Sequence, residues 1–161
     1  MKIQLVPAYL PGFDVRDERV SRGIALGFTR HREGEVAVTE VLATIEKSPR
    51  PSPWSSYWAW CRDEDAYVGL CAFKAPPGPL KAVEVAYYTF PLLEGRGIAT
   101  QMAAHQISIA RSHHLNNVTA HTLPAVNASG SVLRRLGFDY IGEEIDPEDG
   151  PVWAWRHTLT L

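Results

Sequence analysis

The sequence predicts a single domain of the α+β class, and two observations carry this prediction. The chain has 161 residues, of which 45% are hydrophobic and 10% aromatic, enough to build one substantial core. Alternating apolar runs, typical of half-buried strands, are interleaved with runs of three-to-four-residue periodicity, typical of amphipathic helices. The chain contains no internal repeat or low-complexity segment, so residues 1–161 are expected to form one domain.

The N-terminal part is expected to contain a strand and two helices. Residues 2–6 fit an edge strand, and the apolar spacing of residues 15–28 fits a helix that is weakened by two glycines. Residues 34–47 fit a second helix. It should end at residues 48–53, where three prolines impose an extended loop.

The rest of the chain alternates strands and helices. Residues 54–61 and 66–74 are β-rich and are joined by a short charged turn, which predicts an antiparallel hairpin. The remaining elements follow in order: a strand at 82–90, a helix at 98–113, a strand at 117–122, a helix at 129–136 and strands at 138–142 and 152–161, the last two joined by an acidic linker at 143–151.

Composition excludes several classes of partner. A formal net charge of −2 and a pI near 6.3 give no basic surface for nucleic acid or an anionic membrane. No apolar run approaches the roughly 18 residues of a membrane span, and Gln4 and Pro7 interrupt the start too early for a secretory segment. A cytoplasmic protein is therefore expected. Cys61 and Cys71 are then expected to be core thiols, although neighbouring strands would also permit a disulfide.

The segment Glu94–Thr100 joins a predicted strand directly to a predicted helix. Gly95 and Gly97 allow close approach to the backbone, and the start of the helix offers free N–H groups and the positive end of its dipole. This pattern favours a phosphate site, although similar junctions also occur as plain connections.

Two separated motifs resemble the GCN5-related N-acetyltransferase superfamily, and in particular its ribosomal-protein N-terminal acetyltransferase branch. The first is the strand at 83–91 followed by Glu94–Thr100, and the second combines Asn127-Ala128-Ser129 with the segment 132–138. The resemblance covers roughly residues 54–142.

The resemblance implies the architecture. It implies a mixed, mostly antiparallel, twisted sheet of about six to seven strands with about four helices on both faces. The sheet would splay between the strands at 82–90 and 117–122, and acetyl-CoA would enter the gap. Residues 1–50 would supply the acceptor side, residues 54–142 the acetyl-CoA-binding core and residues 152–161 a closing strand.

The resemblance also implies the residues that bind the coenzyme. Pantetheine would pair with the splayed strand at Tyr87, Tyr88 and Thr89, and the phosphates would lie on the loop formed by Glu94, Gly95, Arg96, Gly97, Ile98, Ala99 and Thr100. Asn127 and Ser129 would cap the following helix or contact the coenzyme. Glu94 departs from the usual Arg or Gln, so it is expected to point away from the phosphates or to pair with Arg96.

Three candidates arise for the chemistry of acetyl transfer. Glu84 occupies the position of a glutamate base in histone-type members of the superfamily, and a purely structural role for it stays open. The position of the usual tyrosine that protonates the leaving thiolate is Leu133, so Ser129 and Tyr140 are the substitutes. Direct transfer in a ternary complex is expected.

Other clusters have simpler explanations. His113, His114 and His121 lack the further ligands that a metal site requires, so no metal is expected. Most tryptophans are expected in the core, with Trp54 the best candidate for an acceptor pocket.

The sequence therefore predicts an acetyl-CoA-dependent N-acetyltransferase that acts on a small amine or a peptide N-terminus. The alternative is a non-catalytic module that binds or senses acyl-CoA. The expected partners are acetyl-CoA and an amine, without nucleic acid or membrane, and the protein would be a monomer or homodimer.

Overall fold

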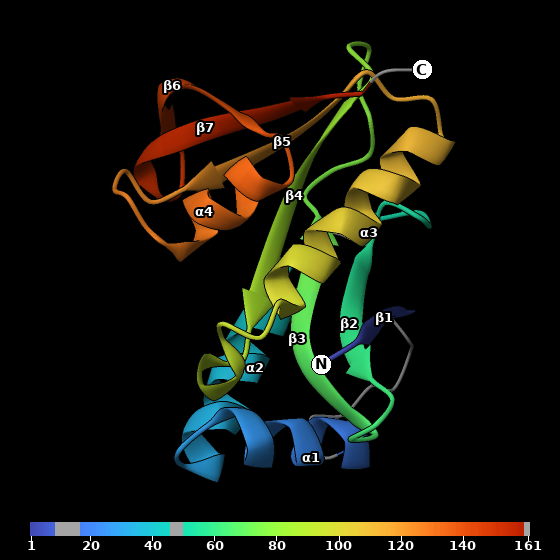
Figure 1. Ribbon diagram of the computed structural model, residues 1–161, viewed down its shortest axis with the longest axis vertical. Coiled ribbons are helices and arrows are strands. Elements are labelled where there is room, and N and C mark those ends of the chain that lie inside the picture. Colours follow the sequence, from blue (N-terminus) through green and yellow to red (C-terminus); the bar gives the residue numbers. More distant parts are fainter. Residues whose placement is uncertain (9–16, 46–49, 160–161) are drawn as a thin grey trace.

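A computed structural model, which describes residues 1–8, 17–45 and 50–159, is built on a seven-stranded sheet of order β1-β2-β3-β4-β5-β7-β6 (Figure 1). Only β4 and β5 run parallel, and every other neighbouring pair is antiparallel. The elements are β1 (Ile3–Pro7), α1 (Glu18–Gly27), α2 (His31–Ile45), β2 (Ser56–Cys61), β3 (Ala66–Phe73), β4 (Ala82–Thr89), the 3-10 turn η1 (Pro91–Leu93), α3 (Ile98–Ser112), β5 (Asn117–Thr122), α4 (Ala128–Arg135), β6 (Asp139–Asp146) and β7 (Gly150–Thr158). The expected mixed, mostly antiparallel sheet is confirmed.

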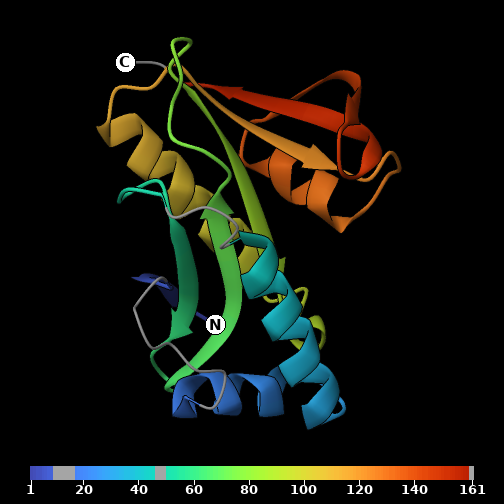
Figure 2. The same ribbon diagram turned by 180° about the vertical axis from the view of Figure 1, so that it is seen from behind.

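Helices cover both faces of this sheet. Figure 1 shows α3 and α4 in front of the strands, and the reverse view in Figure 2 shows α2 on the opposite face with α1 across one end. The largest buried side chains include Trp58, Phe73 and Trp155, so the core extends through both halves of the sheet. Cys61 and Cys71 are buried, free thiols.

The two N-terminal helices form where the sequence predicts them, with shifted ends. The first prediction begins at Val15, outside the described residues, and α1 starts at Glu18 behind the N-cap Asp17. The second helix starts at His31 rather than Gly34. Gly34 therefore lies inside α2. A Cβ at this position would stand 2.5 Å from Ile24, so the contact between α1 and α2 requires a residue without a side chain. The predicted end at Lys47 lies outside the described residues.

Gly23 marks the closest approach of α1 to the sheet, and we expect Gly23→Ala to destabilise the protein strongly. The added Cβ would lie 1.7 Å from the backbone carbonyl oxygen of Tyr67, so the helix or the strand must move. The expected loss is roughly 3 kcal/mol, or about 6–12 °C in Tm by differential scanning fluorimetry. Gly78→Ala is the control, because nothing lies within 4 Å of its Cβ position. An equal Tm for both variants would contradict this prediction.

The C-terminal hairpin corrects one expectation. The acidic linker predicted at 143–151 is mostly strand, since β6 continues to Asp146 and β7 begins at Gly150. Pairing with β7 overrides the weak β-propensity of the acidic residues. Asp146 Oδ1 closes the turn by accepting hydrogen bonds from the backbone N–H groups of Glu148 (2.8 Å) and Asp149 (3.0 Å).

Trp54, the expected candidate for an acceptor pocket, packs into the hydrophobic core. Its side chain is buried, and its ring packs edge-on against Phe73 and His113 with centroid separations of 5.2 Å in both contacts. The ring is part of the core because the segment that precedes β2 turns back over the end of α3.

Candidate functional site

The sheet opens between β4 and β5. These strands pair only through Ala82–Asn117, Val83–Val118 and Glu84–Thr119, although β4 continues to Thr89. Within the described residues, the β4 edge beyond Glu84 has no strand partner on that side. Figure 1 shows the two strands diverging from a common end, which confirms the predicted splay. Backbone groups along this open edge are therefore free to pair with an extended ligand.

A cavity of about 520 Å³ lies beside this open edge. Its lining comes from the end of β4, the junction before α3 and the first turns of α4: Tyr87, Tyr88, Thr89, Leu93, Glu94, Gly95, Gly97, Ile98, Ala99, Thr100, Ala128, Ser129, Ser131, Val132 and Arg135. Most of the predicted coenzyme residues are thus brought together, whereas Arg96 and Asn127 are not part of the lining. The size and depth suit one extended small molecule.

The junction before α3 has the geometry of an anion site. Gly97 caps the helix in the left-handed region, with φ 79° and no side-chain cap. The first amide to bond back along the helix is that of Gln101, to Gly97 O at 3.1 Å, so the amides of residues 98–100 have no intrahelical acceptor. A Cβ on Gly95 would meet nothing within 4 Å, and space is therefore open above the loop.

Two polar side chains of β4 fit an amide-bearing ligand in the cavity. Thr89 Oγ1 is buried and has no hydrogen-bond partner among the described residues. The Tyr87 hydroxyl donates to Ser129 O at 3.4 Å, which links β4 to α4 across the cavity. Burial raises the pKa of Tyr87 to about 12, so this phenol keeps its proton at neutral pH. An amide group of a ligand bound in the cavity would satisfy the orphaned Thr89 hydroxyl.

Glu94 belongs to the cavity lining, and among the ion pairs of the described residues none joins it to Arg96, so of the two expected arrangements only a side chain that points away from the phosphates stays open. Burial raises the pKa of Tyr88, and the negative charge of Glu94 raises it further. The cation at this cavity is instead Arg135, on the last turn of α4, which sequence reasoning missed although it lies in the 132–138 motif.

The candidates for thiolate protonation lie in different places. Ser129 lies in the first turn of α4 and lines the cavity, while the Asn127 side chain caps that helix by accepting from Gly130 N at 2.9 Å. Tyr140 lies on β6, outside the cavity lining, with its ring against Trp153 (5.2 Å) and Trp155 (5.5 Å). Leu133 is fully buried.

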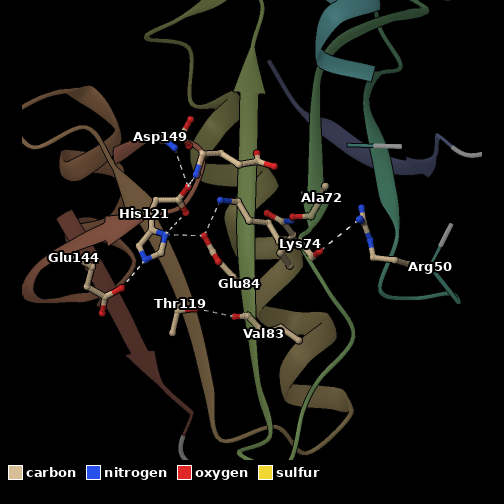
Figure 3. A network of polar contacts seen from close by, with 12 residues as sticks. Arg50, Ala72, Lys74, Val83, Glu84, Thr119, His121, Glu144 and Asp149 are labelled. Carbon is tan, nitrogen blue, oxygen red and sulfur yellow. Dashed lines mark hydrogen bonds and ion pairs between the residues drawn. The ribbon is translucent and has the colours of Figure 1, made fainter. Parts of the chain in front are cut away.

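Glu84 lies at the apex of the split, on the face opposite Val83 and Val85. Its Oε1 is 2.8 Å from Lys74 Nζ and 3.0 Å from His121 Nδ1 (Figure 3). Burial lowers the pKa of Lys74, but hydrogen bonding and charge from Glu84, together with the charges of Asp146 and Asp149, outweigh it and raise that pKa. The sequence identified Glu84 but missed its partners, because the register of β3 and of β5 on β4 brings them together.

Two further findings concern membrane spans and metal sites. None of the helices in the described residues has the length and apolarity to cross a membrane, and the His, Cys, Asp and Glu side chains of these residues form no group of three that could hold a metal ion.

A split sheet with an open strand edge, ending in a glycine-bearing helix start, defines a protein that binds a phosphate-bearing, extended coenzyme. The family model for the acetyltransferase (GNAT) domain matches residues 8–139. The chain belongs to the GNAT acetyltransferase family, and acetyl-CoA is accordingly its acetyl donor.

Solved structures share this fold at low sequence identity. RimJ of Mycobacterium smegmatis, in complex with CoA-disulfide, is 18% identical with a TM-score of 0.68, over 97% of this chain and 81% of that one. The ribosomal-protein-S5-alanine acetyltransferase of Vibrio fischeri is 18% identical with a TM-score of 0.64, over 97% and 91%. An acetyl transferase of Salmonella typhimurium that modifies the N-terminal serine of ribosomal protein L7/L12 is 20% identical with a TM-score of 0.58, over 83% and 77%. No curated protein sequence matches the chain significantly.

Substitution of Arg135 tests whether this residue of the cavity lining contacts a phosphate of the coenzyme. We expect Arg135→Ala to raise the Kd for coenzyme A about fivefold to tenfold by isothermal titration calorimetry, because one charged contact to a phosphate is lost. Arg134→Ala is the matched control, since the guanidinium carbon of Arg134 lies 5.1 Å from the centroid of the Trp155 ring instead of lining the cavity. Equal affinities for the two variants would refute a phosphate contact by Arg135.

Proposed function

We propose that this protein transfers the acetyl group of acetyl-CoA to a primary amine by direct attack within a ternary complex. The observation that carries the proposal is that the open edge of β4 begins at Glu84. A donor bound along that edge, with its phosphates at the start of α3, brings its thioester toward a carboxylate. Positioning of the two substrates then supplies much of the rate.

The donor is held by the residues that line the cavity. The phosphates bind the amides that follow Gly95 and Gly97, together with Arg135, and pantetheine pairs with the strand at Tyr87–Thr89. The phosphates can approach the backbone amides only where no large side chain stands in the way, which explains the glycines at positions 95 and 97. Asn127 contributes indirectly, through the cap that fixes the start of α4.

Glu84 is the proposed general base. The acceptor amine binds as an ammonium ion and gives a proton to this carboxylate, and its nitrogen then forms a bond to the carbonyl carbon. The bond from carbon to sulfur breaks, coenzyme A leaves as the thiolate, and the second proton of the nitrogen, released as the amide forms, reaches the thiolate through its proton donor. Ser129 is the proposed proton donor to the thiolate, because it lines the cavity, and Tyr140 stays the second candidate.

The acceptor is a small amine or a peptide N-terminus. Ribosomal-protein acetyltransferases among the structures with this fold support the peptide N-terminus, whereas the net charge of −2 favours neither acceptor. The second candidate function is an acyl-CoA sensor without turnover, which Glu94 in the cavity and Leu133 at the tyrosine position favour.

One experiment separates these functions. Release of free coenzyme A from acetyl-CoA is followed with a thiol reagent, against a panel of small amines and of peptides with different N-terminal residues. Turnover that requires an amine supports the transferase. A rise in Tm with acetyl-CoA but no turnover on any amine supports the sensor, and the absence of both would refute the two functions together.

A further inference from the structure

His121 is the least expected member of the cluster at the apex of the split. It lies on β5, two residues beyond Thr119, the last residue that pairs with β4. Its Nδ1 is 3.0 Å from Glu84 Oε1, and its Nε2 is 3.0 Å from Glu144 Oε2 on β6 (Figure 3). Asp146 Oδ2 lies 3.8 Å from the same Nδ1. The ring therefore connects β4 to the outer hairpin.

The chemistry of these contacts fixes the role of the ring. The ring is hydrogen-bonded through Nε2 to Glu144 Oε2, an oxygen that only accepts, whereas the 3.0 Å approach of Nδ1 to Glu84 Oε1 is a close contact without hydrogen-bond geometry. Glu144 thereby holds the ring in one orientation, with Nδ1 beside Glu84 Oε1. The His121 side chain is 20% exposed, whereas the Glu144 side chain is 54% exposed.

Lys74 and His121 approach the same oxygen of Glu84. Lys74 Nζ contacts Oε1 at 2.8 Å, and His121 Nδ1 contacts Oε1 at 3.0 Å. Oε1 is itself buried, although the Glu84 side chain as a whole is 26% exposed. Neither contact involves Oε2.

We propose that His121 is a positioning residue, which with Lys74 clamps Oε1 of Glu84 so that Oε2 faces the acceptor amine. This inference rests on the proposed function. In the transfer, Oε2 takes the ammonium proton while Oε1 keeps its close contacts with Lys74 and His121, so the carboxylate does not rotate during the reaction. Glu144 acts through His121, as a support for the orientation of its ring.

The test compares steady-state kinetics of four variants on an amine that the natural protein acetylates. His121→Ala removes the clamp from β5, and we expect kcat to fall about 10-fold to 100-fold with KM for acetyl-CoA nearly unchanged, because the donor cavity is not touched. His121→Asn keeps an amide N–H near the position of Nδ1 and should recover most of kcat. Glu144→Gln should lower kcat less than His121→Ala.

Glu143→Gln is the matched control. Glu143 precedes Glu144 on β6 and lies opposite Trp153, whereas Glu144 lies opposite Val152, so their side chains point to opposite faces of the sheet. Its kcat should equal that of the natural protein. Tm is recorded for every variant, since a purely structural clamp would lower Tm and coenzyme affinity together.

The outcomes are distinct. A natural protein with no turnover would overturn the proposed function, and this assignment with it. Turnover in the natural protein together with an unchanged kcat in His121→Ala would overturn the assignment alone. The same holds if His121→Asn is as slow as His121→Ala while its Tm matches that of the natural protein.

Discussion

Gly97→Glu should abolish binding of coenzyme A, with a rise in Kd of at least about 100-fold. Gly97 is the N-cap of α3 with φ 79°, where a side chain is strained, and its Cβ would project into the open space beside the free amides of residues 98–100. A carboxylate there would repel the phosphates and occupy their place. Calorimetric titration with coenzyme A measures the change directly.

The control for this variant is Gly150→Glu. Gly150 has a similar φ of 72° and nothing within 4 Å of its Cβ position, but it is the first residue of β7, next to the turn that follows β6. The Gly150→Glu substitution introduces the same charge and a comparable backbone strain. It should therefore lower Tm to a similar extent and leave coenzyme affinity unchanged. Normal binding by Gly97→Glu would show that the phosphates bind elsewhere.

Glu84→Gln should lower kcat about 10²-fold to 10⁴-fold, the range that loss of a general base produces. The amide keeps the size of the side chain and an oxygen for Lys74 and His121, but it does not take up a proton at neutral pH. KM for acetyl-CoA should change little, because Glu84 is not part of the cavity lining. Initial rates at saturating acetyl-CoA give kcat.

Two further measurements distinguish a catalytic role of Glu84 from a structural role. Coenzyme affinity and Tm of Glu84→Gln should stay close to those of the natural protein. Undiminished kcat would assign Glu84 to a structural role at the apex, which is the alternative that the sequence also allowed. A parallel fall in kcat, Tm and coenzyme affinity would lead to the same conclusion.

Much of the fold was predictable, because local patterns survive in the tertiary structure. The alternation in residues 82–90 and the glycine-bearing junction that follows reappear as β4 and the start of α3. The predicted coenzyme residues Tyr87, Thr89 and Ser129 line one cavity for the same reason, since they lie on elements whose order and spacing the two motifs define. The acidic hairpin was not predictable, since pairing with β7 decides its conformation.

The sequence by itself determined the glycine-bearing junction at Glu94–Thr100 between a strand and a helix, and the presence of a carboxylate at Glu84, because strand, turn and helix are local consequences of residue spacing. Only the tertiary structure decided what surrounds that carboxylate. Lys74, His121 and Glu144 come from three different elements, separated along the chain by up to 70 residues. Their meeting depends on the register of β3, β4, β5 and β6 through β7, which is set by packing of the whole sheet and not by any local pattern.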